Sequence, residues 1–361
     1  MIPTPPLTFA PDSPYRRLAA ALDSLPNRFP PAPDGSDLRL LAGLFTPEQA
    51  GLAAGLLPEL ETPSQICERL ARDPYETAAM LKEMSQKGLI ASGKTPQGRL
   101  GFGLLPFVVG IYENQNERID RELAQLFEDY FLHAFGRVLD LTPKVHRVIP
   151  VGESIPNTME VQPFESVSGL IDQAKSWGVS DCICRKQKAL IGQACQHPVD
   201  VCMILSSKPD AFAGSTTTRS LTRQEAYQTL QRAARAGLVH CVSNNQSEIY
   251  YICNCCTCSC GVLRGMVDLG IANVVARSPF VNRVDEELCT GCGECLSACQ
   301  FNALTVDGTA RVQENRCAGC GVCIQFCQQG ALRLERRPGE SAPPVNEADW
   351  RSARRSALQA G

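Results

Sequence analysis

Cysteines set this sequence apart, because their number and spacing are those of metal chemistry. The chain has 361 residues and 19 cysteines; Cys67 stands alone, and the other 18 lie between positions 182 and 327. The densest run, YICNCCTCSCG at 251–261, holds five cysteines within eight positions. Thiols packed so closely would oxidise or cross-link unless a metal ion or a cluster bound them.

An internal repeat is the strongest signal. The segments CTGCGECLSACQFNAL (289–304) and CAGCGVCIQFCQQGAL (317–332) align without gaps, and each has the spacing Cys-x2-Cys-x2-Cys-x3-Cys. A [4Fe-4S] cubane takes one thiolate on each iron, and cysteines at every third position of a loop wrap three of its corners. Zinc is the alternative for paired Cys-x2-Cys units, but the additional cysteine in both copies argues against it.

This repeat resembles the two-cluster ferredoxin module of bacteria. The resemblance implies that the fourth cysteine of each run binds the other cluster. The implied ligands are Cys289, Cys292, Cys295 and Cys327 for cluster 1, and Cys317, Cys320, Cys323 and Cys299 for cluster 2. Gln300 and Gln328 stand where this family usually has proline. That departure leaves the loop geometry and the reduction potential open, but not the ligation.

Ten further thiols lie upstream of the repeat, enough for two more cubanes. The candidate ligands are Cys182, Cys184, Cys195, Cys202, Cys253, Cys255, Cys256, Cys258 and Cys260, and Cys241 completes the ten. One plausible grouping joins the four cysteines of 182–202, and a second takes four of the five in 253–260. Alternation along an extended chain would place Cys253 and Cys255 on one face and Cys256, Cys258 and Cys260 on the other.

The grouping of these thiols stays open at this point. Zinc, or a cluster with mixed ligands, remains an alternative to an all-cysteine cubane. His197 and His240 lie close to cysteines and are alternative ligands, although packing is the commoner role of a histidine in such a position. Residues 165–335 also resemble a cysteine-rich domain found beside ferredoxin modules in proteins of anaerobes. That resemblance implies no particular reaction.

The patterns predict an α+β multidomain protein. Residues 36–105 read as three helical stretches followed by a hairpin, an order that resembles the winged-helix superfamily, and Asp73-Pro74 predicts a helix start. Thr222 and Glu225 predict a capping box for another helix, which Gly237 would end. The expected parts are a proline-rich arm (1–35), a winged-helix-like domain (36–142), a linker (143–164), a cysteine-rich α/β iron-sulfur domain (165–283), a ferredoxin-like domain (284–336) and a polar tail (337–361).

Charge and motifs exclude several classes of function. Residues 36–130 carry 14 acidic and nine basic side chains, whereas contact with phosphates needs a basic face, so DNA binding is not expected. No P-loop, Gly-x-Gly-x-x-Gly after a strand or Ser-His-acid order is present. The apolar stretch at 102–112 is too short to enter a membrane. The run after Arg16-Arg17 is too short for a signal peptide, so we expect a cytoplasmic protein with reduced thiols.

We therefore expect an iron-sulfur protein that relays single electrons through two ferredoxin-type [4Fe-4S] clusters and one or two further clusters. It would be an electron carrier or an electron-transfer subunit rather than a stand-alone enzyme. Residues 284–334 carry six acidic side chains against three arginines, which predicts a redox partner with a basic docking face. The alternatives are a redox-sensing regulator that uses the winged helix, or an oxidoreductase subunit with a substrate-binding cluster.

Overall fold

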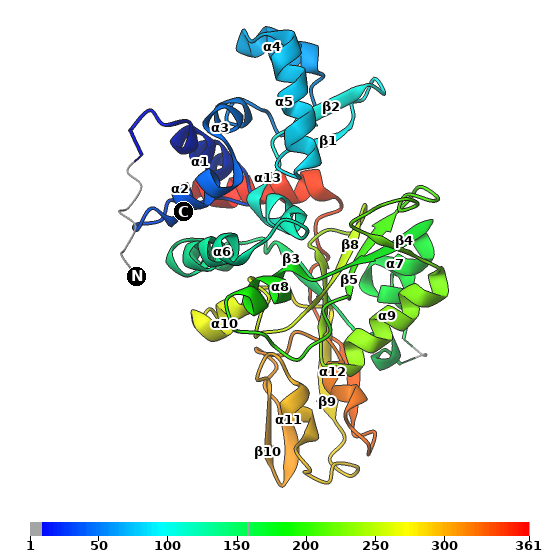
Figure 1. The fold of residues 1–361 in the computed structure, drawn as a ribbon. Coiled ribbons are helices and arrows are strands. Elements are labelled where there is room, and N and C mark those ends of the chain that lie inside the picture. Colours follow the sequence, from blue (N-terminus) through cyan, green and yellow to red (C-terminus); the bar gives the residue numbers. More distant parts are fainter. Residues whose placement is uncertain (1–8, 157–158, 361) are drawn as a thin grey trace. The chain divides into compact units, whose positions relative to one another are not determined.

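The computed structural model describes residues 9–156 and 159–360, and the chain divides into two compact units. Unit 1 comprises Met1–Val138 and Leu190–Gly192, and unit 2 comprises Leu139–Ala189 and Gln193–Gly361. Unit 1 combines helices with a two-stranded sheet, whereas unit 2 is built on a six-stranded sheet (Figure 1). This mixture fits the expected α+β class. Within the described ranges, no helix is both long and apolar enough to cross a bilayer.

Unit 1 is mainly helical, and proline begins four of its helices. The side chains of the preceding residues, Ser13, Thr46, Thr62 and Asp73, each accept a hydrogen bond from a backbone N–H of the first turn. Proline suits the position that follows, because its φ is already helical and because the backbone N–H that it lacks would have no partner inside the helix. The elements are α1 (Pro14–Ser24), α2 (Ser36–Leu44), α3 (Pro47–Ala53), α4 (Pro63–Leu70), α5 (Pro74–Gln86), β1 (Ala91–Lys94), β2 (Leu100–Gly103), η1 (Phe107–Ile111), η2 (Glu113–Gln115), α6 (Arg121–His133) and η3 (Phe135–Asp140), the last running into unit 2.

The expected order of three helical stretches and a hairpin is present between α2 and β2. Strands β1 and β2 pair antiparallel, and Glu61 pairs with Phe102 beside them. The helix start predicted at Asp73-Pro74 is confirmed as the beginning of α5. Membership of the winged-helix superfamily stays a prediction, because an order of elements does not by itself establish it.

Unit 2 contains an antiparallel sheet that presents two different faces. Its elements are β3 (His146–Ile149), η4 (Gly152–Ser154), η5 (Pro163–Glu165), α7 (Val167–Gln173), β4 (Ser176–Ser180), α8 (Ile183–Leu190), β5 (Cys202–Ser206), β6 (Arg219–Leu221), α9 (Arg223–Arg235), β7 (Val239–Ser243), β8 (Tyr251–Cys255) and α10 (Arg264–Asp268). The strand order is β3-β7-β8-β5-β4-β6. One face packs against α7 and α9 (Figure 1). The buried core between them includes Met203, Val242 and Ile252. Because strand side chains alternate, the neighbours of these three residues point to the opposite face.

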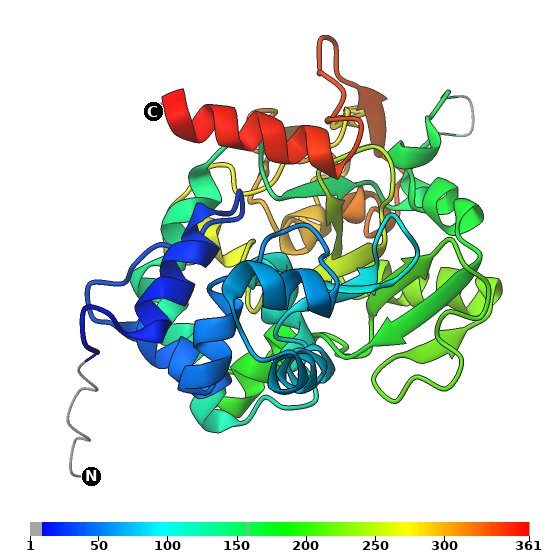
Figure 2. The same cartoon turned by 90° about the horizontal axis from the view of Figure 1, so that it is seen from above.

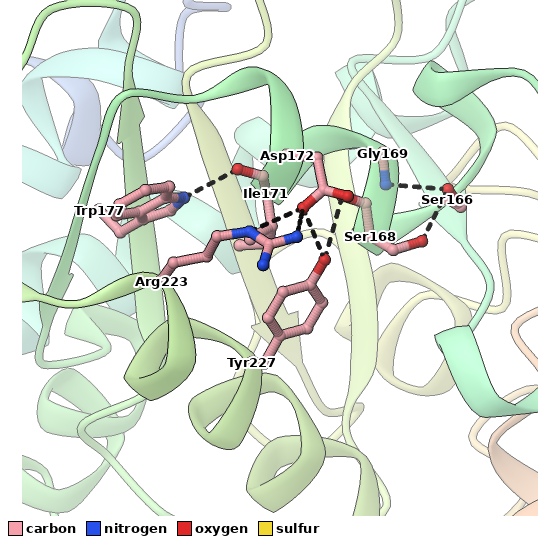
Figure 3. Close-up of polar contacts among 8 residues, drawn as sticks. All are labelled: Ser166, Ser168, Gly169, Ile171, Asp172, Trp177, Arg223 and Tyr227. Atoms are coloured by element: carbon pink, nitrogen blue, oxygen red, sulfur yellow. Dashed lines mark hydrogen bonds and ion pairs between the residues drawn. The ribbon is translucent and has the colours of Figure 1, made fainter.

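Helices α7 and α9 are joined by Asp172. Its carboxylate accepts hydrogen bonds from the guanidinium of Arg223 and, at 2.9 Å, from the hydroxyl of Tyr227 (Figure 3). Trp177 of β4 donates from its indole nitrogen to the carbonyl oxygen of Ile171 in α7 at 3.0 Å. These contacts hold the two helices over the apolar face and leave the other face to the thiols.

Two segments expected to be a linker and a polar tail are part of unit 2. Strand β3 lies inside the range expected to be a linker. It is short and buried and it pairs with β7, although the prolines on either side suggest a linker instead. Helix α13 (Glu347–Ala360), the long red helix in Figure 2, lies inside the polar tail. The Trp350 indole donates to the Lys144 carbonyl oxygen at 2.9 Å, and the Arg354 side chain is fully buried. This helix is therefore packed rather than free.

The cysteine repeat folds into two β-α-β halves. These are β9 (Phe280–Val284), α11 (Glu294–Ala298) and β10 (Leu304–Asp307), followed by β11 (Thr309–Val312), α12 (Val322–Gln325) and β12 (Leu332–Arg336). The outer strands β9 and β12 pair antiparallel, and β10 and β11 form a hairpin. The halves are therefore joined at both ends, which brings the fourth cysteine of each repeat toward the other.

Candidate metal centres

Four thiols of the ferredoxin-like module line one hollow. They are Cys289, Cys292 and Cys295 from the first repeat and Cys327 from the second. Cys292 is exposed and Cys295 is buried. We call this set the outer site. Its composition across the two repeats is the one that the ferredoxin resemblance implies.

A second set of thiols, the inner site, is more deeply buried. Cys317, Cys320 and Cys323 are each less than a tenth exposed, and Cys323 interacts electrostatically with the other two and with Cys299. Burial raises the pKa of Cys320 and of Cys323. Because a buried thiolate is unfavourable without a nearby cation, these groups would deprotonate when a metal replaces their protons.

Glycine is required at the same place in both cysteine loops. Gly291 and Gly319 have φ values of 68° and 70°. A Cβ atom at Gly291 would lie 2.1 Å from the carbonyl oxygen of Gly308, and one at Gly319 would lie 2.1 Å from that of Phe280. Only glycine allows this left-handed backbone and this close approach. Each loop can therefore curl tightly around its group of thiols.

Hydrogen-bond donors point at the expected ligands. Three N–H groups each donate to a cysteine sulfur at 3.3 Å, namely Ala310 N to Cys289, Ala303 N to Cys299 and the side-chain amide of Asn282 to Cys323. Such donors stabilise the added negative charge of a reduced cluster and raise its potential. The donor set, the glycine loops and the crossed ligand pattern all fit [4Fe-4S] clusters.

The inner site lies against the rest of unit 2. The backbone N–H of Val151 donates to the Cys320 carbonyl oxygen at 2.9 Å, and the Ser154 hydroxyl donates to the Gly321 carbonyl oxygen at 2.8 Å. The side chain of Cys241, in strand β7, interacts electrostatically with Cys320. The inner site therefore faces the sheet, while the outer site reaches the surface.

Gln300, at a position where ferredoxins usually have proline, makes a specific contact. Its side-chain oxygen accepts hydrogen bonds from the backbone N–H and the hydroxyl of Thr257 at 3.0 and 2.7 Å. Its amide donates to the carbonyl oxygen of Gly237 at 3.1 Å. Gln328, the equivalent residue of the second repeat, is exposed. Gln300 thus links the first repeat to the turn between Cys256 and Cys258, a contact that proline could not make.

The thiol-bearing face of the sheet lies opposite the apolar core. The central strands β5, β7 and β8 carry Cys202, Cys241, Cys253 and Cys255 on this face. Cys241 and Cys253 are direct partners in the register, and the Cys255 thiol lies within hydrogen-bonding reach of both. Three separate stretches of sequence therefore supply one continuous group of thiols.

Three further cysteines extend this group beyond the strands. The Cys184 thiol lies within hydrogen-bonding reach of Cys182 and Cys260; Cys260 also reaches Cys255, and Cys182 reaches Cys202. The pKa of Cys260 is raised to about 12, mainly by its contact with Cys184. We call the whole set the central thiols; its members are Cys182, Cys184, Cys202, Cys241, Cys253, Cys255 and Cys260.

Arg185 supplies positive charge at the edge of the central thiols. Its side chain is only 3% exposed, and it donates to the carbonyl oxygen of Asn254 at 3.1 Å and to the sulfur of Cys256 at 3.7 Å. Burial lowers the pKa of this guanidinium, but the charges of Cys182, Cys202 and Cys256 outweigh burial and raise it. Its Nε and Nη2 atoms have no partner among the described residues. A buried cation with unused N–H groups suits an anionic cluster.

Cys195, His197, Cys256 and Cys258 form a separate group, which we call the compact site. Their ligand atoms all lie within 4.8 Å of one another. Burial opposes ionisation of Cys256, but the contacts with His197 and Cys258 and the charge of Arg185 lower its pKa to about 6. The pKa of His197 is raised, chiefly by its contact with Cys256. Cys195 thus lies in the compact site. The grouping that the sequence suggested, in which Cys195 joins Cys182, Cys184 and Cys202, is not the one in the structure.

Two of these features are not predicted from the sequence. Cys241 is not among the candidate ligands, because only the pairing of β7 with β8 shows where its thiol lies. Arg185 directly follows Cys184, which is only a weak signal of its role. His240, considered as a ligand, instead contacts Asn254 through Nδ1, and burial lowers the pKa of its ring to about 4.

Comparison with known proteins supports the assignment of the repeat. The model of the 4Fe-4S binding domain matches residues 283–305, which contain the first cysteine run. No curated protein and no solved structure gives a significant match. The chain is thus an iron-sulfur protein with a ferredoxin-type module, and it binds at least one [4Fe-4S] cluster.

Proposed function

We propose that this protein relays single electrons from a docked partner through the outer and inner cubanes to a third cluster on the thiol-bearing face of the sheet. The observation that carries the proposal is the contact of the inner site with the sheet: the N–H of Val151, just after β3, donates to the Cys320 carbonyl oxygen at 2.9 Å, and Val148 of β3 pairs with Cys241 of β7. Cys320 is an expected ligand of the inner cubane, and Cys241 belongs to the central thiols. An electron on the inner cubane therefore has a short path to any cluster that these thiols hold.

The third cluster would take four of five buried or half-buried thiols: Cys182, Cys184, Cys202, Cys255 and Cys260. The contacts among them and the adjacent guanidinium of Arg185 support this set. An all-cysteine cubane in its oxidised form carries a charge of about minus two. A nearby buried cation would lower the cost of that charge in a low-dielectric environment.

The partner would dock at the outer site, where Cys292 is exposed. Leu288 and Leu296 are half and two-fifths exposed beside this cysteine loop. Acidic side chains exposed on the same module include Glu286, Glu287, Glu294 and Asp307. An apolar centre with an acidic surround suits a partner that presents a basic face.

In this proposal, unit 1 is a protein-docking element and not a reader of DNA. Two of its cations are already paired, Arg69 with Glu61 and Lys87 with Glu83. A gel-shift assay with random DNA under anaerobic conditions tests this part. Clear binding at physiological salt would favour the alternative, a redox-sensing regulator.

The decisive experiment counts iron and acid-labile sulfide in protein purified without oxygen. We expect about 12 of each per chain, as three cubanes require. About eight would confine the clusters to the ferredoxin-like module and refute the third cluster. In a variant that combines Cys182→Ser and Cys184→Ser, only three of the five thiols remain and the count should fall by about four, whereas a Cys67→Ser control, altered in unit 1, should keep every iron.

A kinetic measurement tests the relay itself. After rapid mixing with a one-electron donor, the first two cubanes should be reduced before the third. Equal and independent rates for all three clusters in the wild-type protein would contradict an ordered relay.

A further inference from the structure

The compact site lies outside both cysteine repeats and outside the central thiols. Across the described residues, no other set of three or more cysteine, histidine, aspartate or glutamate side chains brings its ligand atoms within 4.8 Å of one another. Several of the central thiols contact one another in pairs, but among the described residues no three of them lie mutually within this distance. The compact site therefore differs in kind from the cubane sites.

Its dimensions match a single tetrahedral ion. With Zn–S bonds of about 2.3 Å and Zn–N bonds of about 2.0 Å, the ligand atoms around a zinc ion stand roughly 3.5 to 3.8 Å apart. The sulfur of Cys258 lies 3.5 Å from Nδ1 of His197. In a cubane each thiolate stands on its own iron, so that the thiolate sulfurs are about 6 Å apart. All four atoms of the compact site are closer than that.

The local sequence explains how the four ligands meet. Cys195 and His197 are two residues apart in the loop after α8, and Cys256 and Cys258 are two residues apart in the turn after β8. The Gln300 contact with Thr257 holds this second pair in place. Cys256 is fully buried and Cys258 is exposed, so the site lies at the surface with one side covered.

Neighbouring groups support negatively charged ligands. The Ser259 hydroxyl donates to the sulfur of Cys195 at 3.4 Å, and Arg185 donates to that of Cys256 at 3.7 Å. Three thiolates and one Zn²⁺ leave a net charge of minus one, which the guanidinium of Arg185 offsets. Hydrogen bonds of this kind orient metal ligands.

We propose that Cys195, His197, Cys256 and Cys258 bind one zinc ion. The ion clamps the loop after α8 to the turn after β8, and its binding displaces the protons that the ligands still hold. Four protein ligands complete the coordination, as in structural zinc sites. Because the same two segments also carry Cys202, Cys255 and Cys260, the clamp would hold the ligands of the third cluster in register.

Metal analysis of the full-length protein, purified without oxygen from cells supplied with both metals, tests the site. We expect about one zinc per chain in the wild-type protein, and at least a fivefold lower zinc content in a Cys258→Ser variant, with the iron of the ferredoxin-like module retained. The Cys67→Ser control should keep its zinc. Wild-type protein without zinc would refute the proposal.

A second variant keeps the test valid if Cys258→Ser fails to fold. His197→Cys retains four ligands, so it should still bind zinc. When cobalt(II) is exchanged into the site, the variant should show stronger sulfur-to-metal charge-transfer absorption than wild type, because it has one more thiolate. An unchanged cobalt spectrum, or the loss of about four irons from the His197→Cys variant, would overturn the zinc site and indicate a cubane instead. These readouts do not depend on whether electrons pass through the protein.

Discussion

The two halves of the cysteine repeat have the same spacing but different surroundings. The outer site takes three ligands from the first repeat and includes the exposed Cys292, whereas the inner site takes three from the second repeat and is buried against the sheet. Their equal spacing gives them the same ligand geometry. A cluster exchanges electrons with a partner only where that partner can approach, so the difference in burial supports different tasks. We therefore propose partner docking at the outer site and internal transfer at the inner site.

The largest expected effect comes from removing one ligand of each site. Cys320→Ser should lose about four irons per chain and abolish fast reduction of the third cluster, because Cys320 is buried and solvent has little access to replace the thiolate. Cys292→Ser should lose fewer irons, since serine or water can bind the exposed corner. Iron analysis and stopped-flow absorbance measure both effects. Equal iron loss in the two variants would contradict the claim that the difference in burial makes the two sites behave differently.

The two glutamines that replace proline offer a matched pair. Gln300→Ala removes the hydrogen bonds to Thr257 and Gly237 and should lower the free energy of unfolding by about 2 kcal/mol. Gln328→Ala, at the exposed equivalent position, should have little effect. Thermal unfolding followed by circular dichroism under anaerobic conditions gives the difference. If both variants melt alike, Gln300 is not the link between the first repeat and the sheet domain.

An ion pair joins strand β12 to the segment before α7. Glu165, 7% exposed, accepts two hydrogen bonds from Arg336 at 2.9 Å each. Burial raises the pKa of Glu165, but the contacts with Arg336, the backbone N–H of Gln162 and the charge of Arg147 together outweigh burial and lower it. We expect Glu165→Gln to destabilise the protein by about 1 to 2 kcal/mol at pH 7. Glu314→Gln, which removes a pair with Arg283 at the surface, should leave the melting temperature unchanged.

The effect of Glu165 should also depend on pH. Its folded-state pKa is lowered, so its stabilisation is complete above the unfolded value of about 4.3 and is lost as the pH falls through the folded-state value. The difference in melting temperature between wild type and Glu165→Gln should therefore be constant from pH 7 to pH 5.5 and shrink below about pH 4.3. A difference that grows on acidification would be inconsistent with this ion pair.

The smallest expected effect concerns the acidic surround of the outer site. Replacing Glu286, Glu287 and Glu294 with glutamine should slow electron transfer to a basic acceptor such as cytochrome c roughly threefold at low salt. The difference should vanish at about 0.5 M salt, because screening removes long-range attraction. Rates that are independent of both charge and salt would show that the partner does not dock here.

Local sequence was informative wherever the chemistry depends on near neighbours. The capping box predicted at Thr222 and Glu225 is confirmed at the start of α9, and Gly237, with a φ of 77°, follows its end. The cysteine repeat likewise predicted a ferredoxin-type module, because the wrapping of a cubane is a property of one loop. Both inferences involve residues only a few positions apart.

The arrangement of the upstream thiols could not be predicted in this way. Alternation correctly separates Cys255 from Cys256 and Cys258, but it places Cys260 on the wrong side. The chain turns after β8, where the N–H of Cys260 donates to the carbonyl oxygen of Cys256 at 3.1 Å, and Cys260 returns to Cys255. Side chains alternate between two faces only in an extended chain, so the turn after β8 invalidates the predicted position of Cys260.

By itself, the sequence determined the kind of chemistry, since the number of thiols and the repeated spacing call for iron-sulfur clusters. Only the tertiary structure decided which distant cysteines meet and which cubane site is covered. Strand pairing brings Cys241 beside Cys253, and the loop after α8 brings Cys195 and His197 to Cys256. Such contacts depend on the packing of segments far apart in the chain, and the spacing of residues within one segment does not predict that packing.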